Sequence, residues 1–187
     1  MNEQWLTWWH SGYWQTAHES WRQDSWFALP DAQRLALTRV RASAPGRQWG
    51  VTPSPLASPQ PLLLSLLALP APQKTRLLAL ADAICGTESD LCGEEKIWCR
   101  RLAKGIRPES WLPQACYAHP VALTLLQALW PACWTRLRMA FPREAALACP
   151  TTPFDLPARR LQPLWEAALW RCGAGEENAG EENNVAA

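Results

Sequence analysis

The chain has 187 residues, of which 48% are hydrophobic, and its formal net charge is +1. This length is enough for one ordinary domain with a sizeable hydrophobic core. The nearly balanced charge argues against a nucleic-acid-binding protein, because such domains carry a clear excess of Lys and Arg. Leu and Ala dominate the apolar residues and β-branched residues are few, which favours an all-α fold.

The first segment, residues 1–43, is rich in Trp. Trp5, Trp8, Trp9 and Tyr13 follow a spacing close to i, i+3, i+4, i+8, which predicts one face of a helix over 5–22.

A second helix is expected from Asp31, which can cap it, to about Ser43. Its pattern predicts that Leu35 and Val40 point inward, whereas most of its Arg side chains point outward. These are Arg34, Arg39 and Arg41. Residues 44–60 are rich in Pro, Gly and Ser and form the best candidate for an internal linker.

Residues 61–172 are expected to form an irregular bundle of short helices, since many of the seventeen Pro punctuate this segment. Helices are predicted over 58–69, 72–84, 94–104, 120–129, 131–140 and 156–172, with a short helix or turn over 108–117. A kink is expected at Pro163. After Gly173, the repeated GEEN unit offers no apolar residues to bury, so 173–187 is predicted to be a disordered acidic tail.

Thirteen Trp are present, and six of them lie in the first 26 residues. Trp dominates both cores and interfaces, because each ring buries a large area and keeps an N–H that needs a partner. The sequence leaves two readings open for Trp5, Trp8 and Trp9, which are burial in a core and contact with a partner.

A basic run is the most distinctive charged feature. Positions 96, 100 and 104 or 107 fall on one face of the expected helix over 94–104, opposite Ile97, Cys99 and Leu102. The run comprises Lys96, Arg100, Arg101, Lys104 and Arg107. One reading is an ordinary solvated face, and the other is a docking patch for an acidic partner.

The seven Cys form an odd number, and the N-terminus lacks the features of a signal peptide, so reduced thiols are expected. Cys85, Cys92 and Cys99 recur every seven residues, which is not the C-x2–4-C spacing of a zinc site. They are therefore interpreted as structural thiols, and no metal or cofactor is expected. A metal or redox function of the seven Cys stays open as an alternative.

Signals of catalysis are weak. The chain has no GxxxxGK[ST], GxGxxG or GxSxG motif, and its three His are not close in sequence to a nucleophile and a carboxylate. Asp90, Glu94 and Glu95 are explained by the capping of a helix. We therefore expect a non-enzymatic protein that acts by contact. The longest apolar run, Pro61–Leu69, is too short for a membrane span.

Three stretches carry a family resemblance: LLLSLLALPAPQKTRLLALADAICG (62–86), EEKIWCRRLAKGIRPESWLP (94–113) and VALTLLQALWPACWTRLRMAFP (121–142). Together they resemble the accessory sorting-platform proteins of bacterial type III secretion injectisomes, the YscK/OrgA class. A leucine-rich helix, a break and a second helix precede a later leucine helix that runs into W-x-R-L-R-x-x-FP. The resemblance covers roughly residues 60–170.

The resemblance implies a cytoplasmic adaptor without catalytic residues, located at the cytoplasmic face of the inner membrane when assembled. It would link the inner-membrane ring protein to the pod-forming platform protein and help to recruit the export ATPase and its regulator. It implies neither nucleic-acid binding nor direct membrane insertion. The matching positions that it offers as partner-binding candidates are Trp98, Arg100, Arg101, Lys104, Trp111, Trp134, Arg136 and Arg138. A secretion chaperone is the alternative within the same broad class.

Overall fold

The computed structural model describes residues 3–40, 44–51 and 53–182. For residues 44–45 and 174–182 it describes the backbone alone. All regular structure in these ranges is helical and none is β-strand, which confirms the all-α prediction. The N-terminal elements are α1 (Glu3–Thr7), the π-helical turn η1 (Trp8–Gly12), α2 (Tyr13–Gln15), η2 (Glu19–Trp21), α3 (Ser25–Ala28), α4 (Asp31–Val40) and α5 (Ala44–Arg47). The remaining elements are α6 (Pro61–Ala68), α7 (Ala71–Ile84), α8 (Gly93–Ile106), η3 (Pro108–Ser110), η4 (Gln114–Ala118), α9 (Val121–Leu129), α10 (Trp134–Leu137), η5 (Arg138–Ala140), α11 (Arg143–Leu147) and α12 (Ala158–Glu182).

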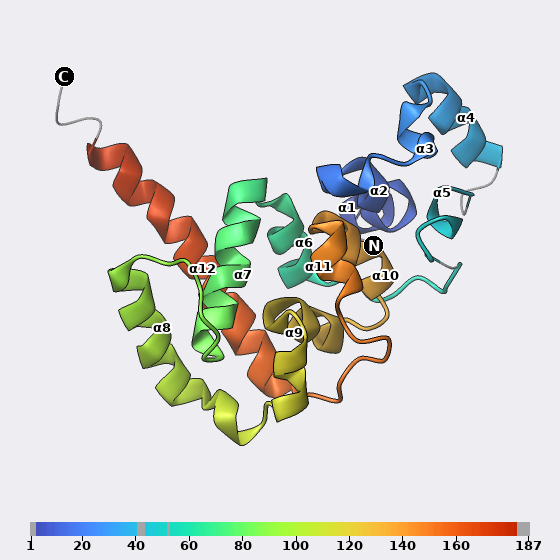
Figure 1. Ribbon diagram of the computed structural model, residues 1–187. Helices are drawn as coiled ribbons and strands as arrows, with labels where there is room; N and C mark the ends of the chain where they lie inside the picture. The colour runs from blue at the N-terminus through green and yellow to red at the C-terminus, as the bar shows by residue number, and fades with distance from the viewer. Residues whose placement is uncertain (1–2, 41–43, 52, 183–187) are drawn as a thin grey trace.

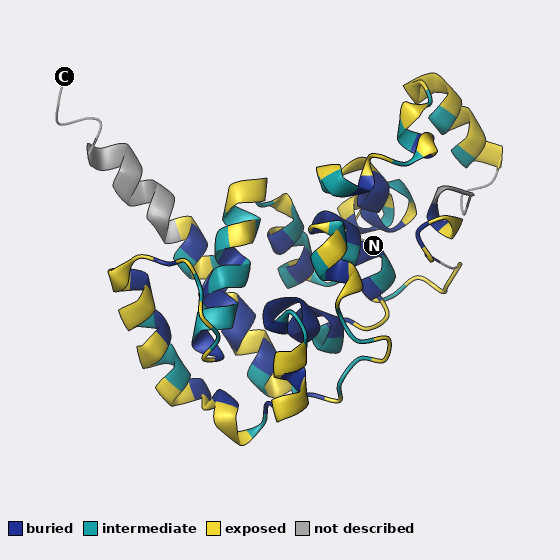
Figure 2. Ribbon diagram, in the orientation of Figure 1, coloured by how far each residue is buried: buried dark blue, intermediate teal, exposed yellow. Residues whose placement is uncertain are grey.

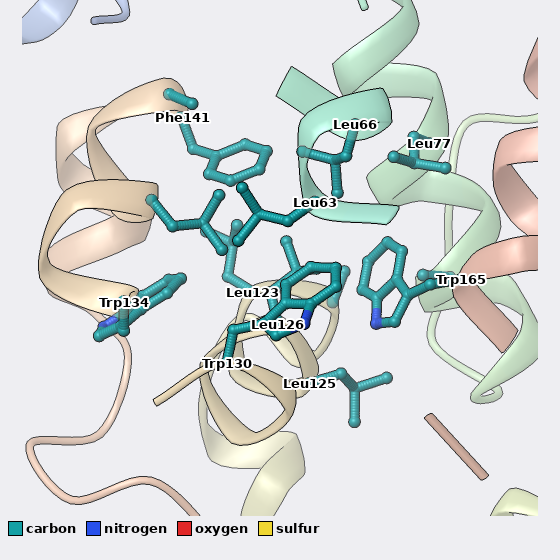
Figure 3. Packing of buried hydrophobic residues seen from close by; sticks show 14 of the residues in the cluster. Leu63, Leu66, Leu77, Leu123, Leu125, Leu126, Trp130, Trp134, Phe141 and Trp165 are labelled. Carbon is teal, nitrogen blue, oxygen red and sulfur yellow. The ribbon is translucent and has the colours of Figure 1, made fainter. Parts of the chain in front are cut away.

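The central core lies between α7, α9 and α12, and α6 closes it on one side (Figure 1). Leu63 and Leu66 of α6 and Leu77 of α7 are fully buried there. Figure 3 shows these side chains converging with Trp165 of α12 on the leucines of α9. Almost every side chain of α9 is buried, as its continuous apolar pattern predicts.

The N-terminal segment is not one helix over 5–22, but a succession of short turns. Its helical path widens into a π-turn at Trp8–Gly12 and then breaks after Gln15. The predicted apolar face is nevertheless confirmed, because Trp5, Trp8, Trp9 and Tyr13 are all buried.

This segment packs against α10 and η5 and shares one hydrophobic cluster with the central core. Trp21 Nε1 donates a hydrogen bond to the Phe141 carbonyl at 2.8 Å, and the His18 N–H donates to the Met139 carbonyl at 2.8 Å. Residues 120 positions apart in sequence are thereby joined, so the Trp-rich segment is part of the folded body.

The stretch predicted as a linker is partly folded. Trp49 and Val51 are buried, and Trp5 Nε1 donates to the Ala57 carbonyl at 2.8 Å. Gly46 sits so close to its neighbours that an added Cβ would lie 2.9 Å from the Tyr13 hydroxyl oxygen and 2.9 Å from Val51 Cβ. A side chain at position 46 would therefore push this loop away from the core.

The C-terminal half follows its Pro residues closely. α7 and α9 begin after Pro70 and Pro120, whereas Pro131 starts a turn rather than a helix, so α10 begins only at Trp134. α12 continues through Pro163 and is assigned as far as Glu182, so the first residues after Gly173 prolong this helix. Residues 183–187, the end of the predicted acidic tail, lie outside the described residues.

Candidate interaction surface

The basic run lies on α8, whose start and end are both fixed locally. Glu94 and Glu95 occupy the first turn, where negative charge suits the helix dipole, and the Cys92 N–H donates to Glu95 Oε2 at 3.2 Å. The helix ends where Arg107 takes a left-handed conformation with φ of 53°. The prediction of a helix over 94–104 is therefore confirmed, with one more residue at its N-terminus and two more at its C-terminus.

α8 has one face against the body and one face toward solvent. Glu95, Cys99 and Ile106 are buried, and Trp98 and Leu102 are half-buried. All five residues of the basic run are exposed, and Figure 2 shows a largely exposed, yellow outer face on α8. Ile97 lies among them with 46% of its surface exposed, so it faces solvent rather than the core that the sequence pattern assigned to it.

Positive charge on this face is not compensated. Within the described residues, no carboxylate oxygen lies within 4 Å of the cationic groups of the basic run. The two carboxylates of α8 are paired with Arg side chains from other helices, since Glu95 accepts from Arg76 Nε at 2.6 Å and Glu94 lies 3.3 Å from Arg171. Like charges at i, i+4 spacing destabilise a helix, so this arrangement costs some stability in the isolated chain.

Glu95 is held as a carboxylate. Burial alone would raise its pKa, but hydrogen bonds from Arg76 and from the Cys92 N–H lower the pKa below its usual range. The Glu95 carboxylate thus forms its ion pair with Arg76, and it does not neutralise the exposed cations on the opposite face of α8.

A groove of about 780 Å³ runs along one side of the basic run, between α8 and the loop after α7. Lys96 and Arg100 form one wall, and the other wall carries Glu88 and Asp90. The groove is therefore of mixed charge, whereas Arg101 and Lys104 do not line it.

Two predicted aromatic candidates lie beside α8. The Arg171 guanidinium is 6.0 Å from the centre of the Trp98 ring. Trp111 Nε1 donates to the Ile106 carbonyl at 3.0 Å, which satisfies a carbonyl at the end of α8. Both rings are half-buried, so the structure gathers Trp98, Arg100, Arg101, Lys104 and Trp111 in one region of the surface.

Trp5, Trp8 and Trp9 occupy a different environment. They are 0%, 6% and 3% exposed, and their ring centres lie 5.1 to 6.2 Å apart. Their surface area is buried inside the protein, so of the two readings left open by the sequence the structure supports the core and not contact with a partner.

Trp134 and Arg136 are corrected in the same way. Both are buried, and the Arg136 guanidinium lies 4.0 Å from the centre of the Trp9 ring. Arg138 is half-buried and donates to the Trp49 carbonyl. These residues hold the N-terminal segment against α10 and η5, and they offer little surface to another protein.

Two exposed features were not predicted. Leu35, Leu37 and Val40 of α4 are 47%, 46% and 83% exposed, so the expectation that Leu35 and Val40 point inward is wrong. Arg34 instead turns toward the body and stacks near the Trp14 and Phe27 rings. Arg41 lies outside the described residues.

The second feature is Trp170 of α12, which is 66% exposed. Its position on the helix could have indicated this, because it lies opposite the stripe of buried α12 residues at helical spacing. That stripe consists of Leu161, Leu164, Trp165, Ala168 and Cys172.

The thiols are mostly buried and poorly ionised. Burial raises the pKa of Cys85 to about 12 and the pKa of Cys99, Cys133 and Cys149 to about 11. Only the thiolate is a good nucleophile or metal ligand, so these side chains are suited to packing rather than to redox chemistry. Within the described residues, no three His, Cys, Asp or Glu side chains are arranged to hold a metal ion.

We predict that a disulfide reagent at pH 8 labels one thiol of the native protein, Cys92, quickly. Cys92 is the exposed thiol, whereas a thiol with a pKa of about 11 is ionised to roughly one part in a thousand at this pH. All seven thiols should react after unfolding in guanidinium. Absorbance of the released reagent gives the counts, and rapid native labelling of Cys85 or Cys133 would contradict the structure.

Comparisons with protein-family models, with curated proteins and with solved structures give no match for this chain. Among the described helices, none combines the length and apolar character that a membrane crossing needs.

Proposed function

We propose that this protein is a non-enzymatic adaptor of a type III secretion sorting platform. It would link the inner-membrane ring protein to the pod-forming platform protein and so help to recruit the export ATPase complex. The observation that carries the proposal is the exposed and uncompensated basic run on α8, within a stretch that resembles the accessory platform proteins.

A solvated face that serves no partner usually intersperses charges of both signs, which gives favourable pairs along the helix. α8 instead carries four exposed cations, with a fifth at the Arg107 that ends it, and its two carboxylates contact Arg76 and Arg171. Such a surface attracts a negatively charged protein surface, speeds encounter and fixes orientation. These are properties that an assembly adaptor requires.

A secretion chaperone is the alternative in the same class, and the cysteine-based function is the alternative in another class. The raised thiol pKa values count against the cysteine-based function. The exposed apolar side chains of α4 are compatible with either kind of interaction protein.

Co-purification from the native bacterium tests the proposal. A tag placed after Ala187 leaves the described body untouched, and mass spectrometry identifies the proteins recovered with it. Recovery of the pod-forming platform protein or of the inner-membrane ring protein is the expected result. Recovery of a secreted effector alone would favour the chaperone, and a chain recovered without either platform component would contradict the adaptor function.

A further inference from the structure

The start of α8 lies against the middle of α12 (Figure 1). Arg171 makes this junction, since its guanidinium contacts Glu94 at 3.3 Å and lies over the Trp98 ring. Trp170 precedes Arg171 and turns away from the core, with 66% of its surface exposed. A large aromatic side chain therefore stands in solvent on α12, one residue before the Arg171 that contacts the start of α8.

The outer residues of α8 form two parallel rows. Ile97, Arg101 and Lys104 follow i, i+4, i+7 spacing and span about 10 Å along the helix axis. Lys96 and Arg100 form the neighbouring row, which borders the groove. Residues Glu94 and Trp98 mark the side of α8 that faces α12. By helical geometry, the row of Ile97, Arg101 and Lys104 lies between the groove row and the α12 side.

We propose that Trp170, Ile97, Arg101 and Lys104 form one docking surface for an acidic amphipathic α-helix of a partner protein. The partner helix lies along this row, its carboxylates pair with Arg101 and Lys104, and one large apolar side chain packs between Ile97 and Trp170. The proposal rests on the proposed function in one respect, namely that the α8 cations bind a protein.

Charge complementarity favours an acidic helix as the partner of this surface. The row presents two cations beside an exposed Ile, and among the described residues no carboxylate oxygen lies within 4 Å of either cation. This complements a helix that bears carboxylates beside an apolar residue. The groove is a poorer place for that helix, because Glu88 and Asp90 on its far wall would repel the carboxylates.

Architecture selects a helix rather than an extended peptide. Peptide strands bind by adding to the free edge of a sheet, and the described part of this chain contains no strand. An exposed helix with side chains at i, i+4 and i+7 instead forms a ridge that fits the surface of another helix. Trp is also the residue type most enriched among the side chains that dominate binding energy, which suits the position of Trp170.

Fluorescence anisotropy with a designed probe tests the docking surface. The probe is a labelled Ala-based helical peptide with Glu at every fourth position and one central Leu, and its control carries Gln in place of Glu. We expect the 187-residue chain to bind the Glu peptide at least about tenfold more tightly than the Gln peptide, with affinity that falls as salt rises. Absence of binding, or equal binding of the two peptides, would overturn the proposal.

Variants then test the apolar contact at Trp170 separately from the charges of Arg101 and Lys104. Trp170→Ala should weaken binding of the Glu peptide by about tenfold, whereas Leu147→Ala, a change at an exposed side chain of α11, should leave it unchanged. The double variant Arg101→Glu, Lys104→Glu should lose the Glu peptide and gain a peptide with Lys at the same positions. Equal binding by the Trp170→Ala variant and the unaltered chain would contradict the role of Trp170 in binding the partner helix.

Two further outcomes distinguish other occupants. Lys96→Glu, Arg100→Glu changes the net charge equally but alters the groove row, so a larger loss than in the Arg101 and Lys104 variant would contradict the proposed path. Binding to vesicles of phosphatidylserine and phosphatidylcholine that is tighter than binding to the Glu peptide would replace the helix with a lipid surface. If platform components co-purify while both peptides fail, the adaptor function stands and this docking mode falls.

Discussion

Trp165→Ala should lower the free energy of unfolding by about 3–5 kcal/mol, which is a large part of the total stability of a typical domain. Trp165 is 0% exposed and lies on α12, where it points toward α9 and Trp130 (Figure 3). Removal of the indole leaves a cavity at the place where α7, α9 and α12 meet. Because the leucines around it belong to three helices, the walls of this cavity can collapse only in part.

Trp165→Phe is the matched control. Trp165 Nε1 is buried and has no hydrogen-bond partner among the described residues, so the change to Phe removes an unsatisfied donor and keeps most of the apolar area. We expect a loss of about 1 kcal/mol or less for this variant. Urea unfolding followed by circular dichroism gives both values. Equal losses for Ala and Phe, or an Ala variant as stable as the unaltered chain, would contradict this packing.

Arg136→Ala should be the most damaging change at a charged residue, with a loss of about 3 kcal/mol in the free energy of unfolding. Arg136 is buried, stacks on the Trp9 ring at 4.0 Å, and donates to the Trp9 carbonyl and to Ser54 Oγ, both at 3.1 Å. Desolvation by burial lowers its pKa, yet the guanidinium stays charged at neutral pH. Its removal leaves the Trp9 carbonyl buried without this donor.

The position of the damage is also predicted. Arg136 joins the N-terminal segment to α10, so its loss should loosen α1 and α2 before the central core. Limited trypsin digestion should then cleave after Arg22 much sooner in the variant than in the unaltered chain. Arg159→Ala, at an exposed position of α12, is the control and should change neither stability nor digestion. Rapid cleavage within the central core instead would contradict the structure.

Sequence patterns predicted the helices of the central core well because their signals are local. A Pro before an apolar run marks the start of α7 and α9, and acidic residues before a basic last turn mark α8. The exposed face of α8 could likewise be predicted, since helical spacing alone puts Arg100 and Lys104 together.

The role of the aromatic residues could not be predicted in this way. A Trp suits a core and an interface equally well, and the choice depends on what the fold brings near it. Trp9 is buried because Arg136, 127 residues away in sequence, covers its ring. The local sequence around Trp9 or Arg136 gives no indication of this contact.

α4 shows the same limit in a helix that was predicted almost correctly. The sequence pattern places Leu35 and Val40 in the core, because apolar side chains usually point inward. Instead, the Arg34 guanidinium lies 5.9 Å and 5.8 Å from the centres of the Trp14 and Phe27 rings, so α4 faces the body with an Arg side chain rather than with Leu35. The rotation of a short helix is therefore decided by long side chains as well as by apolar ones.

The α8 surface is the central claim, and a charge-reversal experiment in the native bacterium tests it most directly. The amount of platform pod or ring protein that co-purifies is measured for the unaltered chain and for Arg100→Glu, Arg101→Glu, Lys104→Glu. A control with the same change of charge reverses Arg39, Arg47 and Arg159, which are exposed on other helices. We predict that recovery falls at least about tenfold only when α8 is altered, with a thermal stability no lower than that of the unaltered chain. Equal recovery with both variants would contradict the assignment of α8 as the docking face.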